Sequence, residues 1–436
     1  MYTTLFWIII ALLLAEFLLD LYLDNKNREA AKWPVPEELN NVYDNEKYNK
    51  QQKYFIENNR FAAFASCFSL AIMLAMFFLF GFGFIDQLAR SFTGYDETSN
   101  WSYILTGLVF FAILYYADSI LTMPFSIYKT FSIEQRFGFN KTTPLLYIKD
   151  TIISWIMTAI IGGLLLGLLM FIYEKTGDFF WILGWILLTL FSMGAMMFYS
   201  SLIVPLFNKQ TPLEDGELRT AIQDFCQKVG FQLDNLYVMD NSKRSTKANA
   251  YFSGLGKKKR IVLFDTLIST LSPEEIVAVL SHEIGHYKRK HTRKMLLFQI
   301  AYYGILFFIM SLFLKNDIAI AQTLYGLDAQ QLSETYHITH GTFWLSIIVF
   351  GMIFTPISTF VSTLMYAVSR KNEFEADAFA KENGLAEPLI SALKKLSSSS
   401  LSNLTPHPYY IFFHFSHPSL LQRIKALRKN CESVLK

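Results

Sequence analysis

The strongest constraint on the fold of this chain is a series of long apolar stretches. Because a helix rises about 1.5 Å per residue, about 20 apolar residues are needed to cross a hydrocarbon core about 30 Å thick. The stretches that meet this requirement are Thr4–Leu23, Phe61–Ile85, Trp101–Met123, Ile152–Tyr173, Phe179–Val204, Met295–Leu314 and Phe343–Val368. Hydrophobic residues make up 52% of the chain and charged residues only 17%, which is too few to cover a soluble surface. The sequence therefore predicts a mainly helical, polytopic membrane protein with seven transmembrane helices.

The distribution of basic residues predicts how these helices are oriented. Residues 24–60, 124–151 and 205–294 are rich in lysine and arginine, as is the tail after residue 368, whereas each intervening loop carries one basic residue. Basic loops stay in the cytoplasm, so the N-terminus is expected outside and both large polar segments inside. The first stretch has no basic segment before it and no small-residue cleavage site after it. It is therefore expected to be a retained span and not a removed signal peptide.

Acidic residues also occur within the apolar stretches, namely Glu16, Asp20 and Asp118. An intramembrane acid usually faces protein or water and not lipid. For Asp118 a buried, hydrogen-bonded position is favoured over a direct role in chemistry.

The fifth loop carries the most informative motif, H-E-x-x-H, at His282, Glu283 and His286. On a helix the two histidines project from one face and can bind a single metal ion, with Glu283 placed to act as general base on a metal-bound water. Residues 272–275, S-P-E-E, combine a capping serine, a proline at the first helical position and a capping-box glutamate. The sequence therefore predicts a metal-binding helix that starts after residue 272.

Two histidines leave zinc in need of a third protein ligand and an open position for water. His291 lies five residues after His286, about 140° around a continuous helix, and is not expected to be that ligand. A better source is the acidic segment after the seventh apolar stretch, where Glu373 and Asp377 share one face of a predicted helix. One of these carboxylates can bind the metal while the other orients a ligand histidine. Glu375 is expected to point elsewhere.

The fifth loop also contains the elements of a small α+β domain. Residues 217–229 have helical periodicity and residues 236–239 are typical of a strand. Two β-prone runs, 249–253 and 260–264, flank a glycine- and lysine-rich turn and predict a hairpin. An edge strand of this kind can pair with an extended peptide and hold it over the metal.

The predicted organisation has four parts. They are five transmembrane helices with their loops in 1–204, the cytoplasmic zinc domain in 205–294, two further transmembrane helices in 295–368, and a cytoplasmic segment in 369–436 that completes the active site.

Several motifs, in order along most of the chain, resemble the type 1 CaaX prenyl proteases, which are integral-membrane zinc metallopeptidases of the gluzincin type. The segments that carry the resemblance are Ile133–Lys141, Pro205–Pro212, Asn249–Phe252, Leu263–Thr266, His282–His286, Glu373–Asp377 and Phe415–Pro418. The resemblance implies seven helices that enclose a water-filled chamber capped by the zinc domain. It also implies cleavage after the prenylated cysteine of a C-terminal C-a-a-X sequence.

The resemblance also implies roles for individual residues. Its zinc ligands map to His282, His286 and Glu373, which would hold one Zn²⁺, and its catalytic glutamate maps to Glu283. This assignment leaves Asp377 as the carboxylate that orients a ligand histidine.

Further positions map to the substrate path. Asn249 and Ala250 correspond to the edge strand that holds the substrate backbone, and His417 and Arg423 correspond to residues near the scissile carbonyl. A ring N–H of His417 could share the charge of the oxyanion with zinc.

The expected partners are a peptide or protein substrate, prenylated at a C-terminal CaaX cysteine, and membrane lipid; no nucleic acid is expected. The membrane would be a bacterial inner membrane, or the endoplasmic reticulum of a eukaryote. Two alternatives stay open: a quality-control protease of broad specificity, and a seven-span transporter or receptor whose zinc is structural. The free glutamate at position 283 favours catalysis over a structural zinc site.

Overall fold

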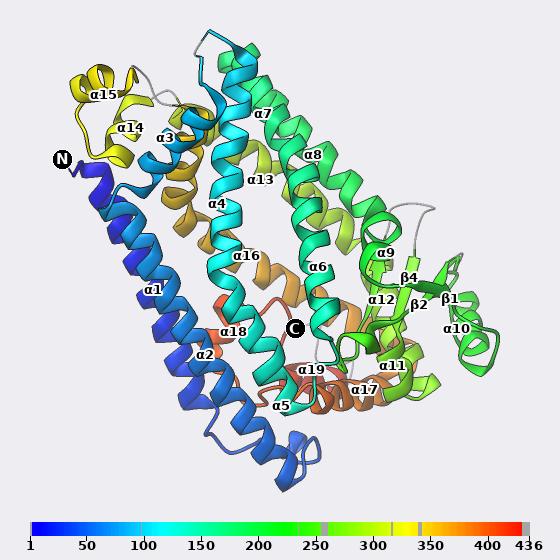
Figure 1. The fold of residues 1–436 in the computed structure, drawn as a ribbon. Coiled ribbons are helices and arrows are strands. Elements are labelled where there is room, and N and C mark those ends of the chain that lie inside the picture. Colours follow the sequence, from blue (N-terminus) through cyan, green and yellow to red (C-terminus); the bar gives the residue numbers. More distant parts are fainter. Residues whose placement is uncertain are drawn as a thin grey trace.

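The computed structural model describes residues 2–96, 98–233, 235–253, 260–314, 317–338 and 342–429. It is mainly helical, with one small sheet (Figure 1). The elements of the first half are α1 (Thr4–Ala30), η1 (Glu37–Leu39), α2 (Asn45–Phe78), α3 (Gly81–Thr93), α4 (Asn100–Tyr128), η2 (Lys129–Glu134), α5 (Gln135–Phe137), α6 (Pro144–Met157), η3 (Thr158–Gly162), α7 (Gly163–Thr176), η4 (Gly177–Phe179), α8 (Phe180–Phe198), η5 (Tyr199–Ile203) and α9 (Val204–Phe207).

The second half contains the sheet and the remaining helices. Its elements are β1 (Gln210–Pro212), α10 (Glu217–Lys228), β2 (Leu236–Met239), η6 (Asn241–Lys243), β3 (Ala250–Ser253), β4 (Arg260–Phe264), α11 (Asp265–Thr270), α12 (Pro273–Lys288), α13 (His291–Phe313), α14 (Asp317–Tyr325), α15 (Ala329–Tyr336), α16 (Phe343–Glu382), α17 (Ala386–Ser399), α18 (Pro408–His414) and α19 (Leu420–Arg428).

Six helical segments among the described residues are long and apolar enough to cross a membrane, as expected for an integral membrane protein. One of them, Pro144–Phe207, has 64 residues and contains both the fourth and the fifth predicted spans. A straight helix of this length would measure about 96 Å, three times the bilayer core. The helical path is broken at Gly177 (φ 50°, ψ −114°), and α7 and α8 then pack against each other. The count of seven spans stays a prediction.

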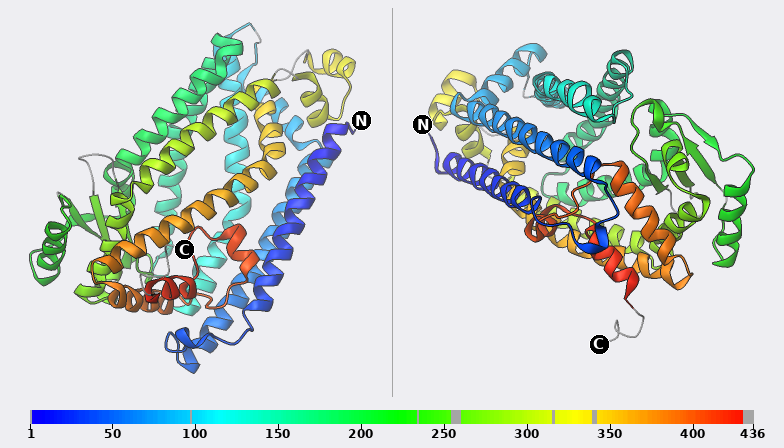
Figure 2. Two further views of the ribbon diagram at one scale, coloured as in Figure 1. Left: turned by 180° about the vertical axis from the view of Figure 1, so that it is seen from behind. Right: turned by 90° about the horizontal axis from the view of Figure 1, so that it is seen from below.

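The spans are exposed over most of their surface. Only 6–22% of the most apolar window of each is buried, whereas a helix against a solid core buries roughly three or four positions in every two turns. Side chains that face lipid count as exposed here, as expected for helices that cross a membrane, and Figure 2 shows these long helices running side by side.

Two predictions about the spans are wrong. The second stretch was expected to continue to Ile85, but α2 ends seven residues earlier because Phe80 adopts a left-handed backbone conformation (φ 55°) that redirects the chain into α3. Asp118, expected to be buried, is exposed. Its helix, α4, buries side chains only within 103–110, in its N-terminal half, and position 118 lies beyond that part.

The ends of the long helices are built differently. Figure 1 shows the sheet, α10 and α12 at one end and the N-terminus, α14 and α15 at the other. At the far end the fully buried Asp86 binds Arg90 (3.0 Å), Tyr325 (2.5 Å) and the indole N–H of Trp344 (2.8 Å). This cluster joins α3 and α14 to the start of α16, so it anchors the helix whose other end carries functional residues.

The helix and strands predicted for the fifth loop are present, while its assignment as a separate domain stays a prediction. Helix α10, strand β2 and the antiparallel pair of β3 and β4 are confirmed, while the hairpin turn at 254–259 lies outside the described residues. The strand order is β1-β2-β4-β3, with β2 and β4 parallel and both outer pairs antiparallel. Strand β3 is therefore an edge of the described sheet.

The segment that leads into β3 is bound to the N-terminal half of the chain. Arg244 makes a two-pronged ion pair with Asp150 of α6, with both N–O distances 2.8 Å, and its carbonyl accepts the N–H of Lys141 (3.0 Å). Three residues later, the ammonium of Lys247 lies 3.0 Å from the carboxylate of Glu134. These contacts fix the entry of the edge strand relative to the membrane helices.

We expect Arg244→Ala to loosen this attachment. Loss of two charge-assisted hydrogen bonds should cost about 1–3 kcal/mol locally, so amide exchange in β3 should become roughly 5- to 150-fold faster. The exchange rate in Arg244→Lys should lie between those of the parent and Arg244→Ala, since lysine lacks the planar pair of donors that binds both carboxylate oxygens. Hydrogen–deuterium exchange with mass spectrometry measures this. The matched control is Arg136→Ala, which removes the more exposed pair with Glu57 and should leave β3 unchanged; equal exchange in all variants would contradict the expectation.

Candidate active site

Helix α12 forms where the sequence predicts it and presents the H-E-x-x-H residues. Its capping box is present: the Ser272 hydroxyl accepts the Glu275 N–H (3.3 Å), and the Glu275 carboxylate accepts the Ser272 N–H (2.8 Å). The Nε2 atoms of His282 and His286 lie 3.2 Å apart. The pair therefore faces one point, as their spacing on a helix requires.

Helix α16 brings Glu373 to the same point. Its carboxylate oxygens lie 3.3 Å from Nε2 of His282 and 3.2 Å from Nε2 of His286, and the three potential ligand atoms are within 4.8 Å of one another. In a tetrahedral zinc site with bonds of about 2.0–2.1 Å, neighbouring ligand atoms lie about 3.3–3.4 Å apart. Oε2 of Glu373 is also buried and has no hydrogen-bond partner in the described part of the chain. The donor set therefore fits a zinc ion.

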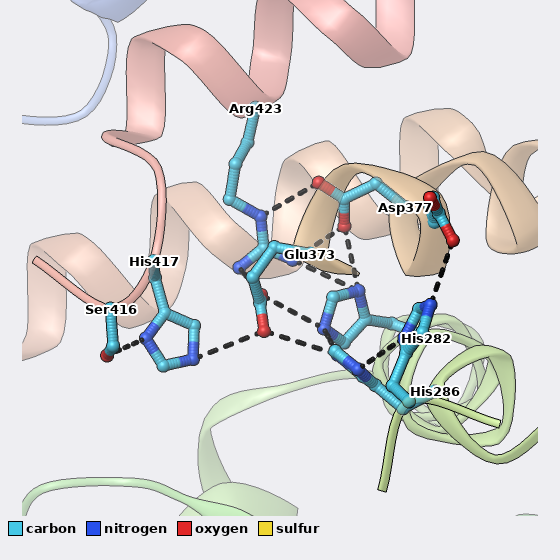
Figure 3. Close-up of polar contacts among 9 residues, drawn as sticks. His282, His286, Glu373, Asp377, Ser416, His417 and Arg423 are labelled. Atoms are coloured by element: carbon cyan, nitrogen blue, oxygen red, sulfur yellow. Dashed lines mark hydrogen bonds and ion pairs between the residues drawn. The ribbon is translucent and has the colours of Figure 1, made fainter. Parts of the chain in front are cut away.

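Asp377, one turn further along α16, holds the first histidine from behind (Figure 3). Its carboxylate lies 2.8 Å from Nδ1 of His282, and Arg423 of α19 binds both of its oxygens at 2.6 and 2.9 Å. Burial disfavours a charged imidazole, but the hydrogen bond to Asp377 and the nearby carboxylate of Glu373 outweigh it and raise the pKa of His282 to about 9. These carboxylates favour a proton on the His282 ring, and a metal ion that binds at Nε2 would displace it.

A glycine allows the two metal-site helices to approach closely. A Cβ at Gly285 would lie 3.1 Å from both the Cα and the carbonyl oxygen of Ala376. Glycine inside a helix is normally unfavourable by up to about 1 kcal/mol, so this position is explained by packing. The absence of a side chain at 285 lets Glu373 reach the histidines.

His417 approaches the site from the segment between α18 and α19. Its Nε2 lies 3.4 Å from Oε1 of Glu373, and 62% of its side chain is exposed. Nδ1 is 2.9 Å from the hydroxyl of Ser416 (Figure 3). Arg370 of α16 donates to the carbonyls of Ile411 (3.1 Å) and Phe415 (2.7 Å), which fixes the end of α18 and the residues that follow it.

The predicted site residues line one cavity with a volume of about 810 Å³, and Asp377 lies behind His282. The predicted residues on its wall are Asn249, Ala250, His282, Glu283, His286, Glu373, His417 and Arg423. Asn249 precedes the edge strand, and its backbone carbonyl accepts the N–H of Phe264 (3.1 Å). The hydroxyl of Tyr251 lies 3.2 Å from both Ser200 of η5 and Gln210 of β1, which ties β3 to the helical segment that follows α8. The edge strand is thus held beside the metal-ligand cluster.

The sequence did not predict the contacts that Ser416, His291 and Glu375 make around the metal-ligand cluster. The 140° estimate for His291 assumed one continuous helix, but α12 ends at Lys288 and Lys290 adopts a left-handed conformation (φ 59°). The chain turns there, and His291 comes back against His286 with the side chain of Glu375 on its other side. Only the proximity of a third histidine to the motif could have drawn attention to this contact.

Comparison with known proteins agrees with this geometry. Residues 25–209 match the family model "CAAX prenyl protease N-terminal, five membrane helices", and residues 212–431 match the model of peptidase family M48. The chain belongs to peptidase family M48. M48 is a family of zinc metallopeptidases, so the chain is an enzyme of this class and not a transporter or receptor with structural zinc.

The relatives in family M48 match almost the whole chain. CAAX prenyl protease 1 of Saccharomyces cerevisiae is 33% identical over 95% of this chain and 93% of its own length. The CAAX prenyl protease 1 homologs of Arabidopsis thaliana and Homo sapiens are 34% and 31% identical, with 96% and 94% of this chain covered and 96% and 93% of their own. The crystal structure of S. mikatae Ste24p superposes with a TM-score of 0.88 at 32% identity, covering 98% of this chain and 99% of that one.

Gly285→Ala should separate α12 from α16. Overpacking of this kind costs about 1–3 kcal/mol, and because Glu373 would move with α16, zinc should be lost more readily. Thermal unfolding and bound zinc per chain, both measured in detergent, report the two effects. Gly351→Ala is the matched control: it lies within α16, and a Cβ there meets no described atom within 4 Å. If Gly285→Ala has the zinc content and the melting temperature of the parent, the close approach of the two helices is not required.

Proposed function

We propose that this chain is a zinc-dependent membrane endopeptidase that cleaves proteins near a prenylated C-terminal CaaX sequence. The observation that carries the proposal is the position of Glu283, which is bound to none of the ligand residues and lines the same cavity as the metal-ligand cluster and the edge strand. Zinc-binding residues beside an unengaged glutamate and an open edge strand form the arrangement that peptide hydrolysis requires.

In this proposal His282, His286 and Glu373 hold one zinc ion. A bound zinc would polarise the scissile carbonyl and lower the pKa of a water molecule. Asp377 fixes the ring of His282 with Nε2 toward the cavity, and Arg423, which binds both oxygens of Asp377, holds that carboxylate in place.

Glu283 is the proposed proton carrier. Its side chain follows His282 on α12 and faces the cavity. It would take a proton from the attacking water and deliver it to the amine that leaves when the peptide bond breaks. One carboxylate can serve both steps because the proton that it gains in the first is the proton needed in the second.

His417 is the proposed donor to the carbonyl oxygen of the substrate. The Ser416 hydroxyl, 2.9 Å from Nδ1, can donate to that nitrogen and so favour the tautomer with hydrogen on Nε2. Nε2 faces the side of the site where Glu373 lies, so its N–H would be available to a developing oxyanion. Arg423 also borders the cavity, with one Nη atom 3.7 Å from Glu373, and we assign it a positioning role in addition to the expected contact with substrate.

The edge strand is the proposed holder of the substrate backbone. Asn249 and Ala250 lie on the cavity wall at the start of β3. A substrate strand beside β3 would lie next to the metal ligands and the N–H donor of His417. The same cavity has an apolar part formed by Met196 and Leu393, among others, which suits a prenyl group. The names of the relatives support a CaaX substrate.

The orientation is also part of the proposal. The sheet and α12, the helix that carries the H-E-x-x-H residues, lie at the end of the helices opposite the N-terminus (Figure 1). Together with the positive-inside pattern, this arrangement supports an active site on the cytoplasmic side.

Glu283→Gln is the direct test of the mechanism. The amide cannot accept the proton, so cleavage should fall by about 10²–10⁴-fold while bound zinc stays stoichiometric. Glu373→Ala should instead lose zinc, because it removes a ligand. Cleavage of a fluorogenic peptide and zinc analysis of the same purified protein distinguish the two. A Glu283→Gln variant that cleaves at the parent rate would contradict the proposed role of Glu283 as proton carrier.

Substrate class is tested with a matched pair of peptides. The purified chain should cleave a farnesylated C-a-a-X peptide and turn over the unprenylated peptide of the same sequence far more slowly. A chelator should abolish both activities, and added zinc should restore them. Equal turnover of the two peptides would favour the quality-control protease of broad specificity.

His417→Ala should lower kcat by about 10²–10³-fold without loss of zinc, as removal of an oxyanion donor does elsewhere. Ser416→Ala should have a smaller effect in the same direction, because it removes only the group that favours the tautomer. Steady-state kinetics with zinc analysis tests both. A change in KM alone for His417→Ala would assign this histidine to substrate binding and not to the oxyanion.

A further inference from the structure

The second ligand histidine, His286, has a support that is separate from Asp377. Its Nδ1 lies 3.0 Å from Nδ1 of His291, and Nε2 of His291 lies 3.0 Å from Oε2 of Glu375. His291 is 3% exposed, whereas the Glu375 side chain is 35% exposed. The side chains of His286, His291 and Glu375 thus form a line from the metal-ligand cluster toward the protein surface.

The proton positions in this line follow from the donor and acceptor inventory of histidine. Nε2 of His286 faces Glu373 and His282, so, given the proposed function, this nitrogen binds zinc and Nδ1 carries the hydrogen. Nδ1 of His291 must then accept that hydrogen, which leaves the hydrogen of a neutral His291 on Nε2. Nε2–H in turn donates to the Glu375 carboxylate. Every ring nitrogen and every N–H group of the two histidines thus has a partner while both histidines are neutral.

The backbone is built to hold His291 in this position. The left-handed conformation of Lys290 (φ 59°) is unfavourable for a residue with a side chain, by roughly 1–2 kcal/mol, yet it turns the chain so that His291 faces His286. Glu375 comes from α16, between Glu373 and Asp377 in the sequence, and it contacts His291 at the start of α13 and not the two ligand histidines.

We propose that His291 and Glu375 are positioning residues that orient the zinc ligand His286. His291 is not a fourth ligand, since the nitrogen it turns toward His286 meets Nδ1, on the opposite side of that ring from the metal-facing Nε2. The two ligand histidines are thus supported differently. A buried carboxylate held by Arg423 orients His282, and a neutral histidine backed by a half-exposed carboxylate orients His286.

The test measures zinc release from the full chain, purified in detergent and loaded with one equivalent of zinc, into an excess of a colorimetric chelator. His291→Ala should release zinc about 10–100-fold faster than the parent, the range found when the partner of a ligand histidine is lost. Glu375→Ala should release zinc about tenfold faster than the parent. The double variant should be no faster than His291→Ala, because Glu375 acts only through His291.

Two further variants separate positioning from a structural role. His291→Gln can accept with its oxygen and donate with its nitrogen, so it should restore slow release to within a few-fold of the parent. Glu382→Ala removes another carboxylate of α16, one that pairs with Arg289 near the end of α12, and should leave release unchanged. The melting temperature of the zinc-free protein should be the same in the parent and in Glu375→Ala.

Three outcomes overturn the proposal. The first is zinc release at the parent rate in His291→Ala, and the second is that the effects of the two single variants multiply in the double variant. The third is faster release that occurs only where the melting temperature of the zinc-free chain is lower and that His291→Gln does not correct. The inference rests on the proposed zinc site, and the two can fail separately. A parent that holds no zinc overturns both, whereas a parent that holds zinc and cleaves peptide, with unaltered release in the variants, overturns only this inference.

Discussion

The contact between α12 and α16 at Gly285 and Ala376 is the constraint on which the rest of the site depends. Gly285 lies between the two histidines of its helix, and Ala376 lies between Glu373 and Asp377 of the other. A Cβ at position 285 would meet the α16 backbone at 3.1 Å, so the helices are as close there as their backbones allow. Ligands that are about ninety residues apart in the chain therefore converge because one side chain is missing.

The long helix α16 transmits this constraint through the molecule. Its 40 residues span about 60 Å. One end is held by the buried Asp86, which binds Trp344, and the other end carries the metal-site carboxylates. Because α16 is continuous through residues 343–382, the position of Glu373 follows from the packing of the membrane-spanning part. The site is complete only when this helix lies against α12.

Local signals in the sequence predicted the parts of the fold that depend on neighbouring residues. The capping box at Ser272, the helix that follows it and the strands of the small domain are set by side chains within a few positions, and all are confirmed. Position in the helix also placed Glu373 and Asp377 on one face. The support of His286 could not be predicted, because it depends on the backbone of Lys290 and on how α13 meets α16.

The same distinction explains the errors in the spans. Hydropathy alone extended the second span through Phe80, since an apolar residue carries no sign of a left-handed backbone. Asp118 was expected to be buried because a carboxylate is costly in lipid. In this fold the buried side chains of α4 lie within 103–110, and the side chain at position 118, beyond them, is exposed.

The edge strand and the metal-ligand cluster are held by different parts of the chain, and this has a consequence for function. The ligands are set by α12 against α16, while β3 is tied to the N-terminal half through Arg244, Lys247 and Tyr251. A peptide beside β3 is therefore positioned by one set of contacts and attacked at a site positioned by another. If the proposed function is right, the distance between the scissile bond and the metal depends on both sets of contacts, and the N-terminal membrane helices would contribute to catalysis by positioning the substrate. Rate losses that leave zinc content unchanged should thus arise from substitutions along this second set of contacts.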